Sequence, residues 1–570
     1  MFNRPSRLIH LFAVSLTVFV SLQCRQAAPE TAPTGYVAES AMVVSARQEA
    51  SEIGIQILRN GGNAFDAMVA TELALAVAYP FAGNLGGGGF MVYRKANGEI
   101  GSLDYREKAP LAAHKDMYLD SLGNVIPGMS TVGATGTGVP GTVAGIFAVH
   151  ERFGTLPIAE IIRPVIDVVE KGVVVTDKQA QRLQNYRQQI IEVNGDNTLF
   201  YNECKTGDTL YYPALANTLK RIALHGRDEF YTGETARILA RFIQEKGGFV
   251  TEEDLAKYQA RWRDPIVFTY KDLRIISMSP PSSGGVTMNQ ILKMMEPFDL
   301  DAYGHNSAKA IQLFTEAARR AYADRNFFLG DPDFVEIPLD ELLGDSYLSQ
   351  RMGTFSFDRA TSSDAVSHGA VEIIESEETT HYSIVDAQGN AVSVTTTLNG
   401  AYGSKLYCDE LGFFLNNEMD DFSSKPGTPN MFGLIGAEAN SIAPEKRMLS
   451  SMTPTIVERD GALWMVVGTP GGSTIITAVT QTILNVYEFG LSMQEAVNAP
   501  RFHHQWLPDM ITFENEGFSK SLMDSLKVRG YQINEGRTPI IGKVDAIRVL
   551  EGGRLEGGAD PRGDDKAVGY

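Results

Sequence analysis

The feature that most constrains the fold is a pair of β-type segments in the third quarter of the chain. Residues 379–386 and 391–398 are rich in β-branched side chains, and only the four residues AQGN separate them. The glycine in this linker supplies the positive φ angle that a tight turn needs, so the pattern predicts a β-hairpin. A three-residue loop closed by Asp386 and Asn390 places Thr379 directly opposite Thr397.

The segment in front of the hairpin, residues 354–378, has a different character. It is polar and ends in a cluster of acidic residues: Glu372, Glu375, Glu377 and Glu378. We expect this segment to be exposed and mobile.

Thr379 has two interpretations. A threonine at the start of a strand is normally structural, and a Thr379–Thr397 pair across a hairpin is common in sheets. If the Glu378–Thr379 bond is cut, however, Thr379 carries both a hydroxyl and a free α-amine, whose unperturbed pKa is about 7.7–8.0. The amine can then act as the base for its own hydroxyl, with the Thr397 hydroxyl as a hydrogen-bonding partner.

Two polar clusters each suit a charged group. The segment NNEMDDF at 416–422 holds carboxylates and amides that suit an ammonium, with helix or turn capping as the structural alternative. Arg106, Ser450 and Ser451 suit a carboxylate, because a guanidinium and hydroxyls donate hydrogen bonds to its oxygens. Their structural alternatives are a surface ion pair and a polar turn.

Glycine clusters give one further candidate. GTPGGS at 468–473 follows a predicted strand, and the amides of adjacent glycines can approach an oxyanion closely. The alternative is a strand-to-helix turn before Ile475. Residues 136–141 match GxGxxG, but no clear strand precedes them and Pro140 lacks an amide, so we interpret them as the turn that opens a helix at Thr142. The chain contains neither a P-loop nor a GxSxG motif.

The net charge and the placement of cysteines and histidines argue against several classes of function. A formal net charge of −19 repels phosphate, so binding of nucleic acid is not expected. The three cysteines, Cys24, Cys204 and Cys408, form no CxxC, and the nine histidines form no HExxH. His503 and His504 are adjacent and point apart on a strand, so no metal site is expected. Cys204 and Cys408 are able to pair in an oxidising compartment.

The N-terminus predicts an export signal over residues 1–23. Two arginines precede the apolar run Leu8–Leu22, which is shorter than the roughly 20 residues that a membrane helix needs. The sequence VSLQC that ends at Cys24 is similar to a bacterial lipobox. Cys24 is therefore either a lipidated first residue or incidental to ordinary signal cleavage, and residues 24–40 are predicted to be a tether.

The length of the whole chain corresponds to roughly four domains at about 150 residues each. Helices and strands are expected over most of the chain beyond the tether. The pattern predicts helices at 41–58 and 64–77, the second capped by Asn63, strands at 90–93 and 103–106, mainly helices over 143–261, a strand at 268–278 and a helix at 306–328.

Together these motifs resemble the gamma-glutamyltranspeptidase (glutathione hydrolase proenzyme) family of N-terminal-nucleophile hydrolases, from Val43 to Tyr570. The segments that carry the resemblance are GGNA at 61–64, GGGGF at 86–90, DYRE at 104–107, TTHYS at 379–383, LNNEMDDF at 415–422, SSMTPT at 450–455, PGGS at 470–473 and PRFHHQ at 500–505.

The resemblance implies an α+β fold, a four-layer αββα sandwich. It implies self-cleavage between Glu378 and Thr379 into a large subunit, 41–378, and a small catalytic subunit, 379–570, which together form one domain. The enzyme would act outside the cytoplasm, in the periplasm or as a membrane-anchored lipoprotein. It would need no cofactor and would cleave glutathione and other γ-glutamyl compounds, with water, amino acids or dipeptides as acceptors.

The family's site residues carry over by position. Thr379 would be the nucleophile and Thr397 its assistant, and the amides of Gly471 and Gly472 would stabilise the oxyanion. The residues that would hold the substrate's α-carboxylate are Arg106, Ser450 and Ser451. Those that would hold its α-ammonium are Asn399, Glu418 and Asp421.

One departure concerns the loop that would cover the site, Pro426–Asn440. In some bacterial members an aromatic hydroxyl on this loop bonds to the asparagine that matches Asn399. Here the loop offers Phe432, which can exclude water but cannot donate that bond.

Two rival functions remain open at this point. An acylase specific for glutaryl β-lactam side chains would keep the nucleophile but change the ammonium pocket, which Asp421 argues against. An unprocessed, non-enzymatic surface-binding protein would need neither Thr379 nor the Gly471-Gly472 pair.

Overall fold

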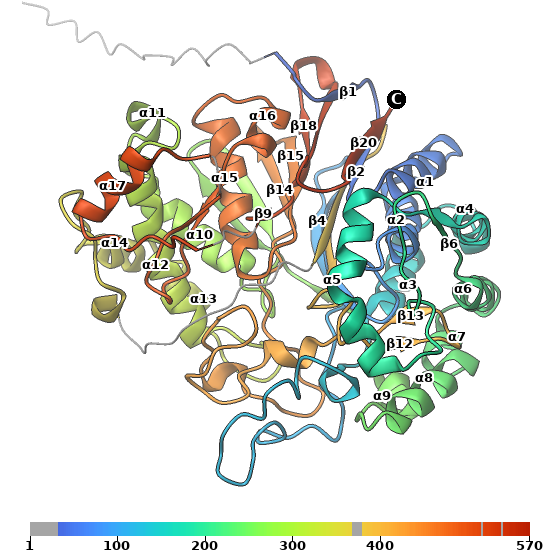
Figure 1. Cartoon of the computed structure of the whole chain (residues 1–570). Coiled ribbons are helices and arrows are strands. Elements are labelled where there is room, and N and C mark those ends of the chain that lie inside the picture. Colours follow the sequence, from blue (N-terminus) through green and yellow to red (C-terminus); the bar gives the residue numbers. More distant parts are fainter. Residues whose placement is uncertain (1–31, 367–378, 515–516, 537–539) are drawn as a thin grey trace, which may run out of the picture.

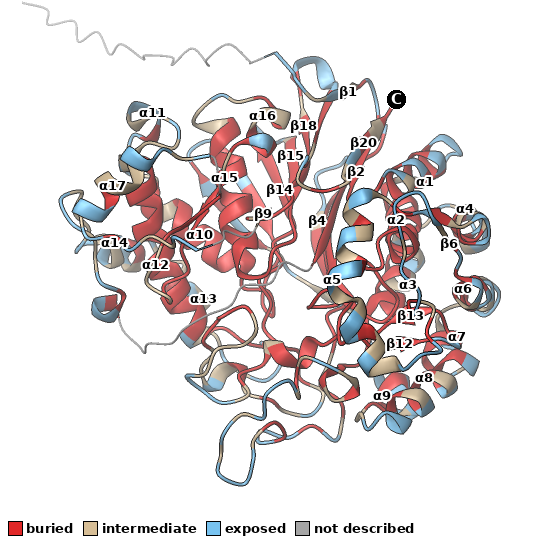
Figure 2. Cartoon of the chain, viewed as in Figure 1, coloured by how far each residue is buried: buried red, intermediate tan, exposed pale blue. Residues whose placement is uncertain are grey.

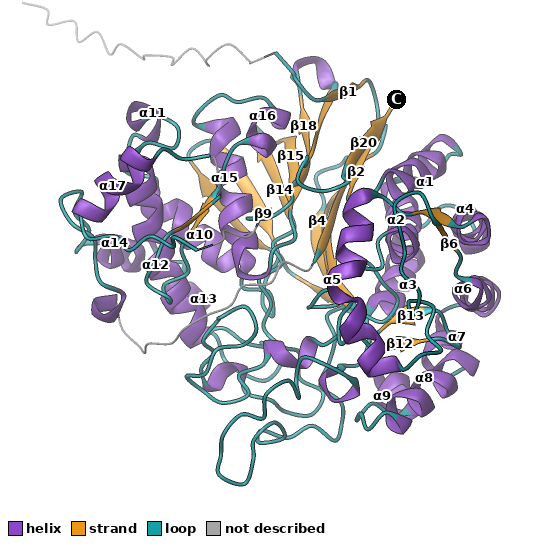
Figure 3. Cartoon of the chain, in the orientation of Figure 1, coloured by secondary structure: helices purple, strands orange, loops and turns teal. Residues whose placement is uncertain are grey.

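Two antiparallel sheets of seven strands each face one another and are covered on their outer sides by helices (Figures 1 and 3). The structure is a computed structural model that describes residues 32–366, 379–514, 517–536 and 540–570. The predicted four-layer αββα sandwich is confirmed. The predicted signal, Cys24 and residues 367–378, which include the acidic cluster before Thr379, lie outside the described residues.

The first sheet carries Thr379 and has the strand order β20-β2-β10-β11-β3-β4-β7. Its strands are β2 (Met42–Ser45), β3 (Gly88–Arg94), β4 (Ile100–Asp104), β7 (Arg261–Arg263), β10 (Thr380–Val385), β11 (Ala391–Thr397) and β20 (Lys566–Gly569).

The second sheet has the order β1-β19-β18-β15-β14-β9-β8. Its strands are β1 (Tyr36–Ala38), β8 (Ile266–Tyr270), β9 (Leu273–Ser277), β14 (Thr455–Arg459), β15 (Ala462–Gly468), β18 (Asp545–Val549) and β19 (Leu555–Ala559). Three two-stranded ribbons complete the β-structure: β5 (Val173–Val174) with β6 (Thr209–Leu210), β12 (Tyr407–Cys408) with β13 (Phe413–Phe414), and β16 (Phe502–His503) with β17 (Thr512–Phe513).

The helices divide between the two outer layers (Figure 1). Beside the first sheet lie α1 (Gln48–Arg59), α2 (Ala64–Ala78), α3 (Thr142–Phe153), α4 (Ile158–Lys171), α5 (Asp177–Asn194), α6 (Pro213–His225), α7 (Arg227–Tyr231), α8 (Glu234–Glu245) and α9 (Glu252–Lys257). Beside the second lie α10 (Gly284–Met295), α11 (Leu300–Tyr303), α12 (Ala308–Phe328), α13 (Leu339–Leu342), α14 (Asp345–Met352), α15 (Ile475–Tyr487), α16 (Met493–Asn498) and α17 (Lys520–Val528).

Strand alternation fills two separate cores. In β3, Phe90 and Val92 pack into the core that contains the second sheet, whereas Met91 and Tyr93 pack into the core beneath α1–α8. The central strands are therefore buried on both faces, as Figure 2 shows. A site built on such strands stands on the most rigid part of the molecule.

The facing surfaces of the two sheets also carry buried polar groups around His381. Its Nδ1 lies 2.9 Å from the Thr395 hydroxyl and its Nε2 lies 3.1 Å from that of Ser383. Burial lowers the pKa of His381 to about 3, so its ring is neutral. A Cβ on Gly468 of the opposite sheet would lie 2.3 Å from the ring, so only glycine makes room there.

Several predicted elements are confirmed. α2 begins after Asn63, whose side chain accepts from two backbone amides in a capping box with Asp66. α3 begins at Thr142, after the glycine turn that matches GxGxxG. The hairpin has the predicted register, with Thr380 opposite Thr396 and Asp386 bonded to Asn390.

Other predicted elements are wrong in type or bounds. Residues 42–45 form β2 and not the start of a helix, because an apolar run buried on both faces has no period that separates strand from helix. The strand predicted at 268–278 belongs to the hairpin of β8 and β9, which turns at Lys271 with φ of 52°. Residues 36–38 of the predicted tether form β1 at the edge of the second sheet.

Cys204 and Cys408 are both free thiols and do not form the disulfide that the sequence left open. Among the helices of the described ranges, none is both long and apolar enough to span a membrane.

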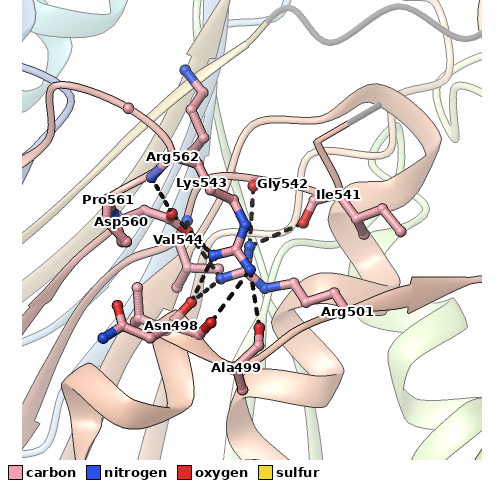
Figure 4. Close-up of polar contacts among 12 residues, drawn as sticks. Asn498, Ala499, Arg501, Ile541, Gly542, Lys543, Val544, Asp560, Pro561 and Arg562 are labelled. Atoms are coloured by element: carbon pink, nitrogen blue, oxygen red, sulfur yellow. Dashed lines mark hydrogen bonds and ion pairs between the residues drawn. The ribbon is translucent and has the colours of Figure 1, made fainter. Parts of the chain in front are cut away.

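A buried charge cluster ties three C-terminal segments together (Figure 4). Arg501 donates to Asp560 at 2.9 Å and to the carbonyls of Ile541 and Gly542 at 3.0 Å each. Arg562 also contacts Asp560, at 3.1 Å. Arg501 and Asp560 are almost fully buried. Arg562 has a second carboxylate partner, Glu514 at 2.6 Å, whereas Asp560 is the only carboxylate of the described residues that forms an ion pair with Arg501.

We therefore expect Asp560→Asn to destabilise the fold by about 3–5 kcal/mol, because it leaves the buried Arg501 without a counter-charge. The shift in the midpoint of urea unfolding measures this. Asp524→Asn is the matched control, since its pair with Lys520 is exposed to solvent and contributes little to stability. Equal shifts for the two variants would contradict the role of the cluster.

Candidate active site

Thr379 directly precedes β10, near the middle of the first sheet, and is 4% exposed. Its hydroxyl lies 3.4 Å from that of Thr397, to which it donates. The Thr397 oxygen also accepts from the amide of Asn399 at 2.8 Å, which fixes its orientation. The pair predicted from the hairpin register is therefore present, at a distance typical of a weak hydrogen bond.

A small cavity opens beside this pair, and loops that are distant in sequence close it. Its lining residues are Arg106, Arg325, Thr379, Thr397, Asn399, Asp421, Phe432, Leu434, Ser450, Ser451, Met452, Gly472 and Ile475. The cavity thus brings together eight of the ten residues predicted for the site. The other two, Glu418 and Gly471, lie next to Arg106 and Gly472.

Arg106 lies at the centre of a buried ion cluster. Its guanidinium is 2.6 Å from Glu418 and 2.5 Å from Asp421. The sequence analysis assigned Arg106 to the substrate's α-carboxylate and these two carboxylates to its α-ammonium. In the structure Arg106 forms ion pairs with both carboxylates directly. A cation and anions side by side form the surface that a zwitterionic amino-acid group matches.

Burial dominates the electrostatics of this cluster. It raises the pKa of Asp421 to about 6 and that of Glu107 to about 8, although Arg106 opposes both shifts. The pKa of Glu418 is raised well above its usual value for the same reason. Burial also disfavours the charged form of Arg106, but Glu418 and Asp421 outweigh it and raise the Arg106 pKa. At neutral pH Arg106 is a cation and Asp421 is mostly an anion.

Two serine hydroxyls form another part of the wall. Ser450 Oγ accepts a hydrogen bond from the amide of Met452 at 3.1 Å, and Ser451 Oγ accepts one from Arg325 at 3.2 Å. The backbone of Ser450 is held by Pro281 and Ser283, in the segment before α10. Arg325 has no motif around it in the sequence, and the sequence analysis missed it.

The glycine pair after β15 forms the turn into α15. Gly471 has φ of 136° and Gly472 has φ of 54°, which side chains rarely adopt. A Cβ on Gly472 would lie 2.5 Å from the ring of Phe432. The predicted strand-to-helix turn is thus present, and its glycines are needed for both conformation and space.

The loop Pro426–Asn440 covers the cavity, and Phe432 is 5% exposed. Neighbouring residues of the loop hold it in place through other hydrogen bonds, none of which replaces the missing bond to Asn399. Asn430 donates to Asp421 Oδ1 at 3.0 Å, and the Met431 amide donates to Asp420 at 2.9 Å. The cavity below has a volume of about 20 Å³, enough for about one water molecule. The loop is therefore closed and must move to admit a larger substrate.

The adjacent histidines have separate partners. His503 Nδ1 lies 2.8 Å from Thr477, whereas His504 Nε2 lies 3.3 Å from Asp509. Burial lowers the pKa of both rings to about 4, so they are neutral at physiological pH. In the part of the chain that the structure describes, no group of three or more His, Cys, Asp or Glu side chains is placed to hold a metal ion.

A threonine before a central strand of an αββα sandwich, inside a pocket with a charge cluster, defines an N-terminal-nucleophile hydrolase. Comparison with known proteins narrows the class further. Residues 50–570 match the sequence model of the gamma-glutamyltranspeptidase family, and the chain belongs to this family.

Individual relatives agree with this assignment. The chain is 43% identical over 575 residues to the glutathione hydrolase proenzyme of Escherichia coli (strain K12), and the match covers 98% of each chain. It is 42% identical to a crystal structure of the Helicobacter pylori gamma-glutamyltranspeptidase, with a TM-score of 0.55 over 58% of this chain and 95% of that one.

A cephalosporin acylase from Bacillus halodurans is similar in fold, with a TM-score of 0.83 over 97% of this chain and 99% of that one. At 23% identity this likeness shows the fold alone. The predicted family, fold and enzyme class are confirmed: the chain is a γ-glutamyl hydrolase and transferase made as a proenzyme.

We expect Gly472→Ala to destabilise the protein by more than Gly461→Ala. Both glycines have positive φ, but a Cβ on Gly461 meets nothing within 4 Å, whereas one on Gly472 meets Phe432. The strained backbone alone costs about 1–2 kcal/mol, which both variants share. The difference between their urea midpoints therefore reports the contact with the covering loop, and equal midpoints would contradict that contact.

Proposed function

We propose that Thr379 is the nucleophile of this enzyme and that glutathione and related γ-glutamyl amides are its substrates. The observation that carries the proposal is one cavity that holds the Thr379–Thr397 pair and the Arg106–Asp421 ion pair together. A hydroxyl nucleophile and a charged pair that suits a zwitterionic group, both lining one pocket, are what cleavage of a γ-glutamyl amide requires, and this supports the proposal.

The proenzyme would first cleave itself. The Thr379 oxygen attacks the carbonyl carbon of Glu378, and the peptide bond is exchanged for an ester. Water then hydrolyses the ester, which releases the Glu378 carboxylate and leaves Thr379 with a free α-amine. The Thr397 hydroxyl, which accepts from Thr379 and from the Asn399 amide, would keep the Thr379 oxygen in position during these steps.

Turnover would repeat this chemistry on the substrate. The α-amine of Thr379 takes the proton of its hydroxyl as the oxygen attacks the γ-amide carbon. The amides of Gly471 and Gly472 would donate to the oxyanion, and the leaving amine takes up the proton. Water then releases glutamate from the γ-glutamyl ester, or the amine of an amino acid or dipeptide forms a new γ-glutamyl amide.

Substrate recognition would use both signs of the ion cluster. Arg106 and the two serine hydroxyls, Ser450 and Ser451, would hold the α-carboxylate. The α-ammonium would lie on the oxygens of Asn399, Glu418 and Asp421. This requirement for an ammonium argues against the rival glutaryl acylase, because a glutaryl group lacks that charge.

The organisation of the mature protein belongs to the same proposal. The large subunit would comprise residues 41–378 and the small one residues 379–570. Residues 1–23 would direct export to the periplasm, and Cys24 would carry a lipid anchor if the segment before it acts as a lipobox.

Thr379→Ala should give one uncleaved, inactive chain, because the variant lacks the hydroxyl that makes both attacks. A denaturing gel and N-terminal sequencing of the wild-type small fragment test this. Thr380→Ala, which changes the next residue, is the control and should still yield two subunits. Cleavage of Thr379→Ala at the same bond would overturn self-processing by this residue.

Asp421→Asn should lower kcat/KM for γ-glutamyl-p-nitroanilide, because the α-ammonium loses its anionic partner. The lost transition-state stabilisation should be about 2–5 kcal/mol. In the wild type, kcat/KM should fall as the pH drops through about 6, where Asp421 takes up a proton. The variant should lose this step.

Glutaryl-p-nitroanilide serves as the control substrate for this variant. Its slow turnover should not be reduced by Asp421→Asn, since it carries no ammonium. An unchanged preference between the two anilides would contradict the proposed contact.

A further inference from the structure

Arg325, near the end of α12, is a buried cation in the wall of the cavity. It is 4% exposed, and its guanidinium donates to three neutral oxygens. Nη1 lies 3.0 Å from Asn326 Oδ1, Nη2 lies 3.2 Å from Ser451 Oγ, and Nε lies 3.3 Å from Ser283 Oγ. Burial lowers the pKa of Arg325 to about 10, so it remains charged at neutral pH.

Arg325 differs from the other buried arginines nearby in having no carboxylate partner. On the same helix, Arg319 pairs with Asp509 and Arg320 with Glu316 at 2.6 Å. Arg106, across the cavity, pairs with two carboxylates. Among the residues that the structure describes, no carboxylate lies within 4.0 Å of the Arg325 guanidinium nitrogens. Burying an unpaired charge is unfavourable, so this side of the cavity favours an anion.

The hydrogen bonds that the two serines accept determine how their hydroxyl groups can donate into the cavity. A guanidinium can only donate, so Ser451 Oγ must accept from Arg325 and its own proton is free for another acceptor. Ser450 Oγ likewise accepts from the amide of Met452, so its own proton is also available to another acceptor. Each hydroxyl therefore has its own proton available to donate into the cavity, which suits a carboxylate.

We infer that Arg325 is a positioning and specificity-determining residue for the substrate's α-carboxylate. It orients the Ser451 hydroxyl as a donor and supplies a positive charge that no carboxylate of the described residues contacts directly, although Asp421 attracts it from farther away. Arg106 would then meet the carboxylate from the acidic side of the cavity and Arg325 from the serine side. This inference rests on the proposed function, because it needs a γ-glutamyl group in this cavity.

The alternative is that Arg325 only ties α12 to the serine segment. The two roles make different predictions for substrates that differ in the carboxylate alone. γ-Glutamyl-p-nitroanilide and 4-aminobutyryl-p-nitroanilide share the scissile amide and the amine, but the second lacks the α-carboxylate. A purely structural residue should affect both equally.

For Arg325→Gln, kcat/KM for γ-glutamyl-p-nitroanilide should fall about 10- to 100-fold relative to that for 4-aminobutyryl-p-nitroanilide, as expected for a lost charged hydrogen bond. Most of the loss should appear in KM. Arg325→Lys keeps the charge and should retain more of the preference. If Arg325→Gln gives no soluble, cleaved enzyme, Arg325→Lys alone decides through its selective rise in KM for the γ-glutamyl substrate.

The matched control is Arg319→Gln, which changes a buried arginine on the same helix that contacts Ser363 and Asp509 instead of the cavity. It should leave the ratio between the two substrates unchanged. Combining Arg325→Gln with Ser451→Ala should give less than the sum of the two separate losses in the ratio, because Arg325 acts partly through Ser451.

Two outcomes would overturn the inference: an equal loss on both substrates in the Arg325 variants, or an unchanged preference. Failure of the proposed function would look different, since the wild-type enzyme would then not prefer γ-glutamyl-p-nitroanilide at all.

Discussion

The site depends on the register of one hairpin. Side chains alternate along a strand, so a slip of one residue would turn Thr379 and Thr397 away from the cavity together. The buried contacts of His381 oppose such a slip, because its ring fits only where Gly468 of the facing sheet has no side chain. The position of the Thr379 hydroxyl is thus determined by packing between the two sheets, through residues that are distant in sequence.

Charge complements this geometry. The cavity wall has an acidic side, where Arg106 pairs with Glu418 and Asp421, and a serine side, where Arg325 has only neutral partners. A zwitterion has one orientation that meets both sides. In the proposed function, the same charges would select the substrate and would direct its γ-amide toward Thr379.

Local patterns in the sequence predicted much of this arrangement, and the rest depended on tertiary contacts. The hairpin, the Asn63 cap and the glycine turn before α15 each carry their signal in adjacent residues, and all three are confirmed. Residues 42–45 were assigned to a helix because a strand buried on both faces has no distinguishing period. Arg325 could not be recognised, because Ser451, its partner in the cavity wall, lies 126 residues away. Asn430 could not be recognised either, because it lies on a loop without a motif, although its partner Asp421 is only nine residues away.

The covering loop has a kinetic consequence. Asn430 bonds to Asp421, the carboxylate that would receive the α-ammonium, and the space beneath Phe432 holds about one water. Neither arrival of a substrate nor departure of a product can precede a displacement of that loop. In the proposed reaction, the rate of each catalytic cycle would then be limited by how often these hydrogen bonds of the loop break, however fast Thr379 attacks.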